Sequence, residues 1–102
     1  MAEPLTGDQI AMLGEILPFW RIEDGMLVRD VQAPTFPIGI EYVVAIAEAA
    51  EALNHHPDID IRWRHLRLAL VTHSAGGRIT DLDLALAQRI DEIVDVGSGG
   101  TS

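Results

Sequence analysis

The sequence predicts a single α+β domain: a four-stranded antiparallel sheet with three helices packed on one face, in the order α-β-β-α-β-β-α. Two observations support this prediction. Apolar residues recur at helical spacing in three segments, and two β-rich regions each divide into a pair of strands. A chain of 102 residues suits one domain with one core. We expect that domain to cover residues 1–96, followed by a disordered tail, GSGGTS, over 97–102.

The first helix and the first pair of strands are marked by short local signals. Thr6 and Gln9 have the spacing of a capping box, which predicts a helix over residues 7–17. Two β-prone stretches then flank Asp24-Gly25. This dipeptide favours a tight hairpin turn, because glycine tolerates the positive φ that such turns require.

The second helix is predicted from Ile38 to Leu53. Pro57 limits its end, because the residue before a proline avoids the α region. His55 and His56 are therefore expected in an exposed loop just after the helix. The predicted buried stripe of this helix consists of Ile40, Val43, Val44, Ala47 and Ala50.

Residues 59–73 predict the second pair of strands. Two apolar sets alternate there with opposite parity: Leu66, Leu68 and Leu70, and Ile59, Ile61 and Trp63. One flat strand cannot bury both sets, so we expect a bend near Trp63 to His65 that separates two strands. After a turn at SAGGR, Thr80 and Asp83 suggest a second capping box. The closing helix then follows, with Leu82, Leu86, Ile90, Ile93 and Val94 on its apolar side.

Composition excludes several classes of protein. Sixteen acidic residues against seven basic ones, all arginine, give a net charge of −9, which disfavours binding to nucleic acid. The absence of cysteine excludes disulfides and thiolate metal sites. No apolar run approaches the roughly 18 residues of a membrane helix, and the first residues do not resemble a secretory signal. We expect a cytoplasmic protein without a membrane partner.

Adjacent histidines are the most informative chemical feature. His55 and His56 precede a proline, and Glu51 lies four residues before His55, on the same side of the predicted helix. A carboxylate at that position would fix the imidazole tautomer. His73 is expected to end the strand of Leu66 to Leu70, pointing to the face without helices. These residues predict a shallow site on that face.

The fourth histidine and a metal site are less favoured. His65 shares the parity of His73 but is eight residues away, about 26 Å along a strand, so we expect an ordinary surface residue. A metal site is not favoured, because His55 and His56 are adjacent and lack the i, i+4 spacing of zinc-binding helices.

The residue types and spacings resemble the signature of the pterin-4a-carbinolamine dehydratases. The match consists of Glu51, His55, His56, Pro57, Trp63 and His73, with Asp83 at the start of the last helix. It covers residues 36–95, and in the N-terminal third it is architectural: a helix, Trp20 and a hairpin. One departure is the DID that follows Pro57, where animal members of the family carry an aromatic residue that helps to line the pocket.

The resemblance implies dehydration of 4a-hydroxytetrahydropterin to quinonoid dihydropterin, without a metal or an organic cofactor. It implies His55 and His73 as the acid–base pair and His56 mainly as a substrate-binding group among the catalytic histidines. An aromatic amino-acid hydroxylase is the implied source of the substrate. The residues expected around the substrate are Glu51, Pro57, Trp63, Asp60, Thr72 and Ser74.

An alternative function is a dimerising or binding module without turnover, since one member of that family doubles as a transcriptional coactivator. The intact histidines favour the enzyme. A different small heterocyclic ligand and a metal site remain as further alternatives. Relatives form dimers or tetramers, so we expect a homo-oligomer. We expect its edge in EDGMLVRDV, where Arg29 and Asp30 could pair across a two-fold axis.

Overall fold

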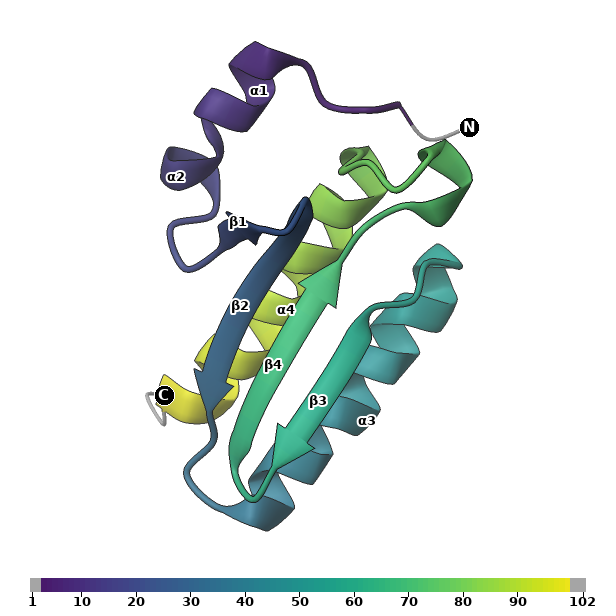
Figure 1. Ribbon diagram of the computed structural model, residues 1–102. Coiled ribbons are helices and arrows are strands. Elements are labelled where there is room, and N and C mark those ends of the chain that lie inside the picture. Colours follow the sequence, from purple (N-terminus) through teal and green to yellow (C-terminus); the bar gives the residue numbers. More distant parts are fainter. Residues whose placement is uncertain (1–2, 100–102) are drawn as a thin grey trace.

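The computed structural model describes residues 3–99 and contains one four-stranded antiparallel sheet (Figure 1). The strand order is β1-β2-β4-β3, so the two hairpins meet at the centre of the sheet. This arrangement confirms the predicted fold class. The strands are β1 (Arg21–Glu23), β2 (Met26–Gln32), β3 (Asp58–Arg62) and β4 (His65–Leu70).

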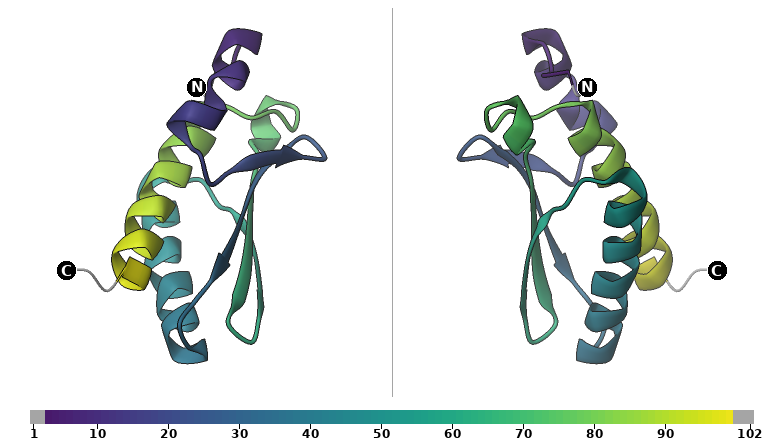
Figure 2. Two further views of the ribbon diagram at one scale, coloured as in Figure 1. Left: turned by 90° about the vertical axis from the view of Figure 1, so that its left-hand side faces the viewer. Right: turned by 90° about the vertical axis from the view of Figure 1, so that its right-hand side faces the viewer.

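Two long helices cover one face of the sheet (Figure 2). Within the described residues no helix covers the opposite face, here called the open face. No helix of this part of the chain is both long and apolar enough to cross a bilayer. The helical segments are α1 (Gly7–Ala11), α2 (Leu13–Ile16), α3 (Phe36–Leu53), the 3₁₀ turn η1 (His73–Ala75) and α4 (Asp81–Gly99).

Both hairpins form tight turns with positive φ. Asp24 and Gly25 have φ values of 53° and 78°, as the hairpin signal predicted. Trp63, with φ 56°, begins the two-residue turn that joins β3 to β4. The bend expected near Trp63 to His65 is therefore a reversal of the chain. It lets Ile59 and Ile61 face the helices together with the leucines of β4, whereas Trp63 itself is 64% exposed.

The core lies between the sheet and the two long helices. Leu66, Leu68 and Leu70 are almost fully buried, as predicted, and Ile59 and Ile61 pack against the same cluster. The closing helix contributes the buried residues Leu86, Ile90 and Val94. Burial of this apolar layer stabilises the packing of the helices on the sheet.

The predicted buried stripe of α3 was wrong in part. Ile40 and Val44 are 39% and 55% exposed, whereas Tyr42, Ile46 and Ala49 are buried. This helix has apolar residues on two neighbouring faces, so its own spacing does not decide which face meets the sheet.

The ends of two helices also differ from the prediction. The first helix, expected over 7–17, is divided at Met12 into two short helices, although the capping box of Thr6 and Gln9 is present. Helix α4 extends to Gly99, so residues 97–99 of the expected tail are helical. Residues 100–102 lie outside the described residues, and the tail there stays a prediction.

Arg29 is buried and paired within the chain. Its guanidinium binds Asp91 and Asp95 of α4, and it lies 4.6 Å from the ring centroid of Phe19. The Trp20 indole also donates to Asp91, at 2.8 Å. The predicted pairing of Arg29 across a two-fold axis was therefore wrong, because its charge is used to join β2 to α4.

Residues 3–5 lie against the segment that leads into α4. The Leu5 N–H donates to the Ile79 carbonyl at 3.0 Å, and the Asp81 N–H donates to the Glu3 carbonyl at 3.3 Å. Pro4 and Thr80 form an isolated β-bridge between these contacts. The first described residues thus cover the start of the last helix.

Candidate active site

Five of the predicted site residues surround one small cavity of about 240 Å³. It lies where the end of α3, the segment after β4 and the start of α4 meet, so the site is at one end of the sheet. The prediction of a site on the open face was therefore wrong. The lining residues are His55, His56, Thr72, His73 and Ser74, together with Asn54, Val71 and Leu82.

The end of α3 directs the two adjacent histidines differently. Asn54 adopts a left-handed conformation with φ 50°, and the His55 N–H donates to the Ala50 carbonyl at 3.0 Å. The chain therefore leaves the helix sharply. His55 turns inward and is only 8% exposed, in contrast to the predicted exposure, while His56 stays at the surface.

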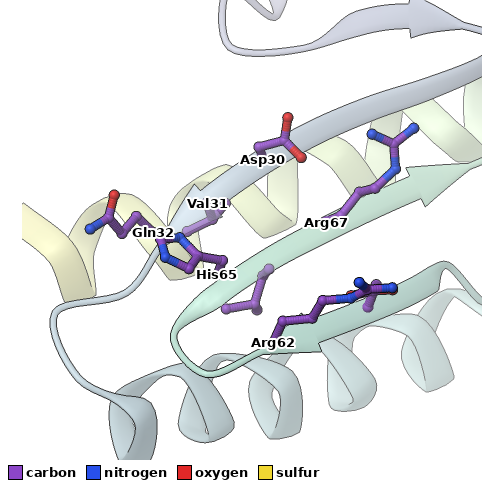
Figure 3. Close-up of a pocket in the computed structure, with 8 residues that line it drawn as sticks. Asp30, Val31, Gln32, Arg62, His65 and Arg67 are labelled. Carbon is purple, nitrogen blue, oxygen red and sulfur yellow. The ribbon is translucent and has the colours of Figure 1, made fainter.

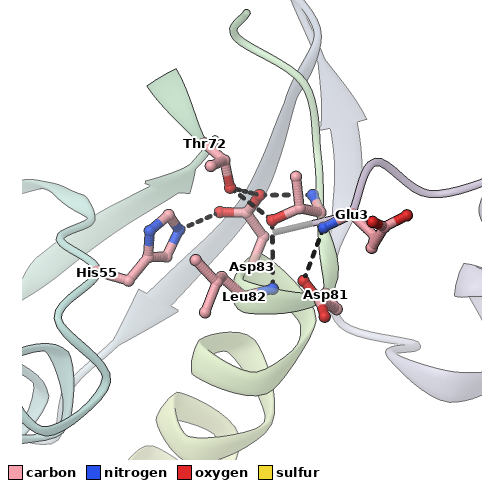
Figure 4. A network of polar contacts seen from close by, with 7 residues as sticks. Glu3, His55, Thr72, Asp81, Leu82 and Asp83 are labelled. Carbon is pink, nitrogen blue, oxygen red and sulfur yellow. Dashed lines mark hydrogen bonds and ion pairs between the residues drawn. The ribbon is translucent and has the colours of Figure 1, made fainter. Parts of the chain in front are cut away.

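His55 is held by a buried carboxylate (Figure 4). Its Nε2 lies 2.5 Å from Oδ1 of Asp83, a residue that is fully buried. The other carboxylate oxygen, Oδ2, accepts hydrogen bonds at 2.8 Å from the Thr72 hydroxyl and from the Thr80 N–H. An ionised carboxylate only accepts, so we assign the proton to Nε2 of His55 and leave Nδ1 as the second nitrogen.

His56 pairs with Glu51 at the surface. Its Nε2 lies 2.5 Å from Oε2 of Glu51, and the two side chains are 60% and 75% exposed. The predicted partner of Glu51 was His55. The helical spacing does not extend to His55, because the helix ends at Leu53.

His73 lies in η1, beyond the end of strand β4 at Leu70. Its predicted place at the end of a strand was wrong, because the Thr72 N–H bonds to the Arg78 carbonyl, at 2.9 Å, and the chain turns. The Thr72 carbonyl accepts from the N–H groups of Ala75 and Gly77, each at 3.1 Å. This turn brings His73 to the cavity.

Four predicted site residues do not line the cavity. Trp63 is in the β3–β4 turn, roughly 20 Å along the strand from Pro57, with its ring against His65 at a centroid distance of 5.7 Å. Asp60 lies in the middle of β3 and accepts from Arg62 at 3.1 Å. Pro57 follows His56 but does not line the cavity, and Glu51 reaches it only through His56.

A larger depression of about 550 Å³ lies on the open face (Figure 3). Its charged groups already have partners: Asp30 with Arg21, Arg62 with Asp60, and Arg67 with Glu23. Hydrogen bonds from Arg67, and then from Arg21, hold the pKa of the Glu23 carboxyl below its usual range. With His65 as its one imidazole, this surface offers less acid–base chemistry than the cavity at His55.

Asp83 and Thr80 are the site residues that the sequence did not assign. Both were recognised as a capping box, and half of that box is present, since the Thr80 N–H donates to Asp83. The same carboxylate also reaches His55, a contact over 28 residues that local spacing cannot predict. The presence of Asp83 in the family signature was the one feature of the sequence that pointed to its role in the site.

A metal site is not formed by the described residues. Among them, no three or more histidine, aspartate or glutamate side chains are grouped so that they could hold a metal ion. His55 and His56 each have a carboxylate partner at a different place.

Comparisons with known proteins show the family of this chain. The family model described as pterin 4 alpha carbinolamine dehydratase matches residues 3–93. The chain belongs to this family. A relative from Mycobacterium sp. (strain JLS), provisionally named a pterin-4-alpha-carbinolamine dehydratase, is 54% identical over 91 residues, covering 89% of this chain and 96% of its own. A Mycobacterium tuberculosis protein with the same provisional name is 49% identical over 87 residues, covering 85% and 92%.

A solved structure supports the fold. The crystal structure of a transcriptional coactivator/pterin dehydratase from Brucella melitensis aligns with a TM-score of 0.84 and 24% identity. The alignment covers 90% of this chain and 99% of that one. The pterin dehydratase family, named for hydro-lyases, thus accounts for both the sequence and the architecture.

Proposed function

We propose that this protein is a dehydratase that converts 4a-hydroxytetrahydropterin to quinonoid dihydropterin and water, as a step in tetrahydropterin recycling. The observation that carries the proposal is the meeting of three imidazoles around one cavity, with His55 fixed by Asp83. Family membership supports the substrate class.

The reaction needs two proton transfers and no change of oxidation state. A base removes the proton from the ring nitrogen beside carbon 4a, and an acid protonates the departing hydroxyl. The C–O bond breaks, and a double bond forms between carbon 4a and that nitrogen. Imidazoles can perform both transfers near neutral pH, each contributing about 10²- to 10⁴-fold.

We assign the acid–base pair to His55 and His73. The contact with Asp83 occupies Nε2 of His55, so Nδ1 is the nitrogen left for the substrate. No hydrogen bond from the described residues engages the His73 side chain, so its imidazole is free to act at the cavity. His56, exposed beside Glu51, is suited to bind the substrate at the rim.

The test is turnover of freshly generated 4a-hydroxytetrahydropterin by the purified protein. We expect His55→Ala and His73→Ala each to lower kcat/KM at least tenfold. His65→Ala is the matched control, because it removes an imidazole from the open face, and it should change kcat/KM little. Equal losses in all three variants would exclude this site. A wild-type protein without turnover would favour the binding module.

Metal dependence is tested in the same assay. We expect kcat/KM to be unchanged by EDTA, because proton transfer by imidazoles requires no Lewis acid. Loss of activity with EDTA and its recovery with zinc would contradict the proposed mechanism.

We also propose that the protein forms a homo-oligomer. Strand β1 pairs only with residues Met26 to Val28 of β2. Residues Arg29 to Gln32 pair with β4 on one side, but their other edge has no neighbouring strand among the described residues. Apolar side chains on α3 are also exposed, with Phe36 at 46% and Val44 at 55%. Strand edges and apolar helix surface of this kind are commonly covered by self-association. Light scattering at micromolar concentration should give a multiple of 11.1 kDa, and a monomer would contradict the proposal.

The cellular setting stays a prediction. A cytoplasmic location and an aromatic amino-acid hydroxylase as the source of the substrate are both consistent with pterin recycling. Comparing pterins produced by candidate hydroxylases as substrates would identify the source.

A further inference from the structure

The hydroxyl groups of Thr72 and Thr80 lie in a buried chain that ends on the carboxylate of Asp83. Figure 4 shows Thr72 directed at Asp83. Thr72 is 2% exposed and Thr80 is fully buried. Their oxygens are 2.6 Å apart, and Thr80 Oγ1 also accepts from the Leu82 N–H at 3.2 Å. The sequence had placed Thr72 among the substrate-binding residues. It is therefore important whether its hydroxyl donates to the protein or remains available to a substrate.

The direction of these hydrogen bonds follows from the number of protons. Each hydroxyl has one proton to donate. If the Thr72 hydroxyl donated to Thr80, no proton would remain between Thr72 and Asp83, since the carboxylate cannot donate. The proton of Thr80 would also lack its acceptor. Donation from Thr80 to Thr72 and from Thr72 to Asp83 satisfies every contact.

This direction commits the proton of Thr72 to the protein. Oδ2 of Asp83 then receives two donors, the Thr72 hydroxyl and the Thr80 N–H, and Oδ1 is left to His55. The backbone of Thr72 is held as well, because its N–H and its carbonyl bond to residues 75–78. Thr72 therefore joins the support of His55 to the turn that carries its neighbour His73.

We propose that Thr72 and Thr80 are positioning residues, which orient the Asp83 carboxylate on His55 and set the distance between His55 and His73. This inference rests on the proposed function, since it assigns these residues a part in the same reaction. A substrate-binding hydroxyl would affect mainly KM, whereas a positioning hydroxyl affects mainly kcat.

The kinetic test uses Thr72→Val, which keeps the shape of the side chain and removes its hydroxyl. We expect kcat to fall about tenfold or more, with KM within about twofold, because small displacements of catalytic groups are costly. Thr80→Val should have a smaller effect, since Asp83 keeps its donor from Thr72. Thr72→Ser should restore most of kcat. A rise in KM at unchanged kcat would overturn the proposal and return Thr72 to substrate binding.

A second measurement does not depend on turnover. The proton on Nε2 of His55 should give a resolved downfield NMR signal that exchanges slowly with water, and Thr72→Val should speed that exchange at least tenfold. Thr35→Val is the matched control: Thr35 caps α3 by accepting from the Ile38 N–H at 3.2 Å and lies outside the site. It should leave both kcat and the exchange rate unchanged, even if it lowers the melting temperature.

The two measurements separate the two proposals. A wild-type protein with the slow proton but without pterin turnover would contradict the proposed function and leave the positioning chain in place. Absence of a slow Nε2 proton in the wild type, or an exchange rate that Thr72→Val does not change, would overturn the positioning chain. Equal acceleration in Thr35→Val would also overturn it, because the effect would then reflect stability alone.

Discussion

The adjacent histidines His55 and His56 each pair with a carboxylate at the same separation of 2.5 Å, yet the surroundings of the two pairs differ. His55 and Asp83 are buried, and the carboxylate receives further donors from Thr72 and Thr80. His56 and Glu51 are largely exposed to water. Distance alone therefore does not distinguish a rigid pair from a solvated one.

The difference indicates which of the two pairs can hold its imidazole in a fixed orientation. An exposed pair gains little, because water competes for both groups and the side chains lose rotational freedom when they pair. A buried carboxylate with several donors has one satisfied arrangement, and any other leaves polar groups without partners. We therefore expect the chemistry of the site to depend on Asp83 far more than on Glu51.

The largest effect is expected for Asp83→Asn. The amide has one oxygen, which would face the donors Thr72 and Thr80, so its NH₂ group would face His55. That arrangement favours a proton on Nδ1 and removes the nitrogen that serves the substrate. We expect kcat/KM to fall about 100-fold or more, as is found when a histidine is held in the wrong tautomer. NMR of the imidazole nitrogens reports the tautomer directly.

The matched substitution at the surface pair sharpens this result. Glu51→Gln should change kcat less than about threefold, because the carboxylate is exposed and its pairing is weak. If Glu51→Gln lowered kcat as much as Asp83→Asn, the exposed pair would matter to catalysis as much as the buried pair, which would contradict this expectation.

Stability should show the same order. Asp83→Ala leaves His55, the Thr72 hydroxyl and the Thr80 N–H without their acceptor, so we expect the free energy of unfolding to fall by about 3 kcal/mol. Glu51→Ala should change it by about 0.5 kcal/mol or less. Urea unfolding at neutral pH measures both. Similar losses would indicate that burial does not separate the pairs.

The smallest effect is expected on the open face, where Glu23 is a second example of an exposed pair. Its pKa is lowered in the folded state by Arg67 and Arg21, so its stabilising contribution is present above the unfolded pKa of 4.5 and is lost as pH falls through the folded value. The urea midpoints of wild type and Glu23→Gln should thus differ slightly at neutral pH and converge in acid. A difference that grows in acid would contradict the assigned direction.

Local signals in the sequence predicted much of the fold. The Asp24-Gly25 turn, the reversal near Trp63 and the capping residue Thr6 each depend on neighbours within a few positions, and each is present. The buried face of α3 was not predictable in this way, because Ile40 and Ile46 are equally apolar and the sheet decides between them.

The candidate site was predictable in its histidines but not in its supports. Adjacent imidazoles and the spacing to His73 are visible in one dimension, and the cavity brings these residues together. The partner of His55 depends on how Asn54 ends α3 and where α4 packs, which are tertiary effects. The exclusion of Trp63 from the cavity has the same origin, since it depends on the direction of strand β3.

The strap formed by residues 3–5 has a practical consequence for handling this protein. Its Pro4 forms a β-bridge with Thr80, and the far end of α4 lies at the opposite end of the molecule (Figure 1). An affinity tag or fusion partner joined directly before residue 3 would lie next to Thr80, a member of the hydroxyl chain that supports His55. The same fusion after α4 would leave that chain undisturbed, so the choice of terminus decides whether an engineered sample reports the native site.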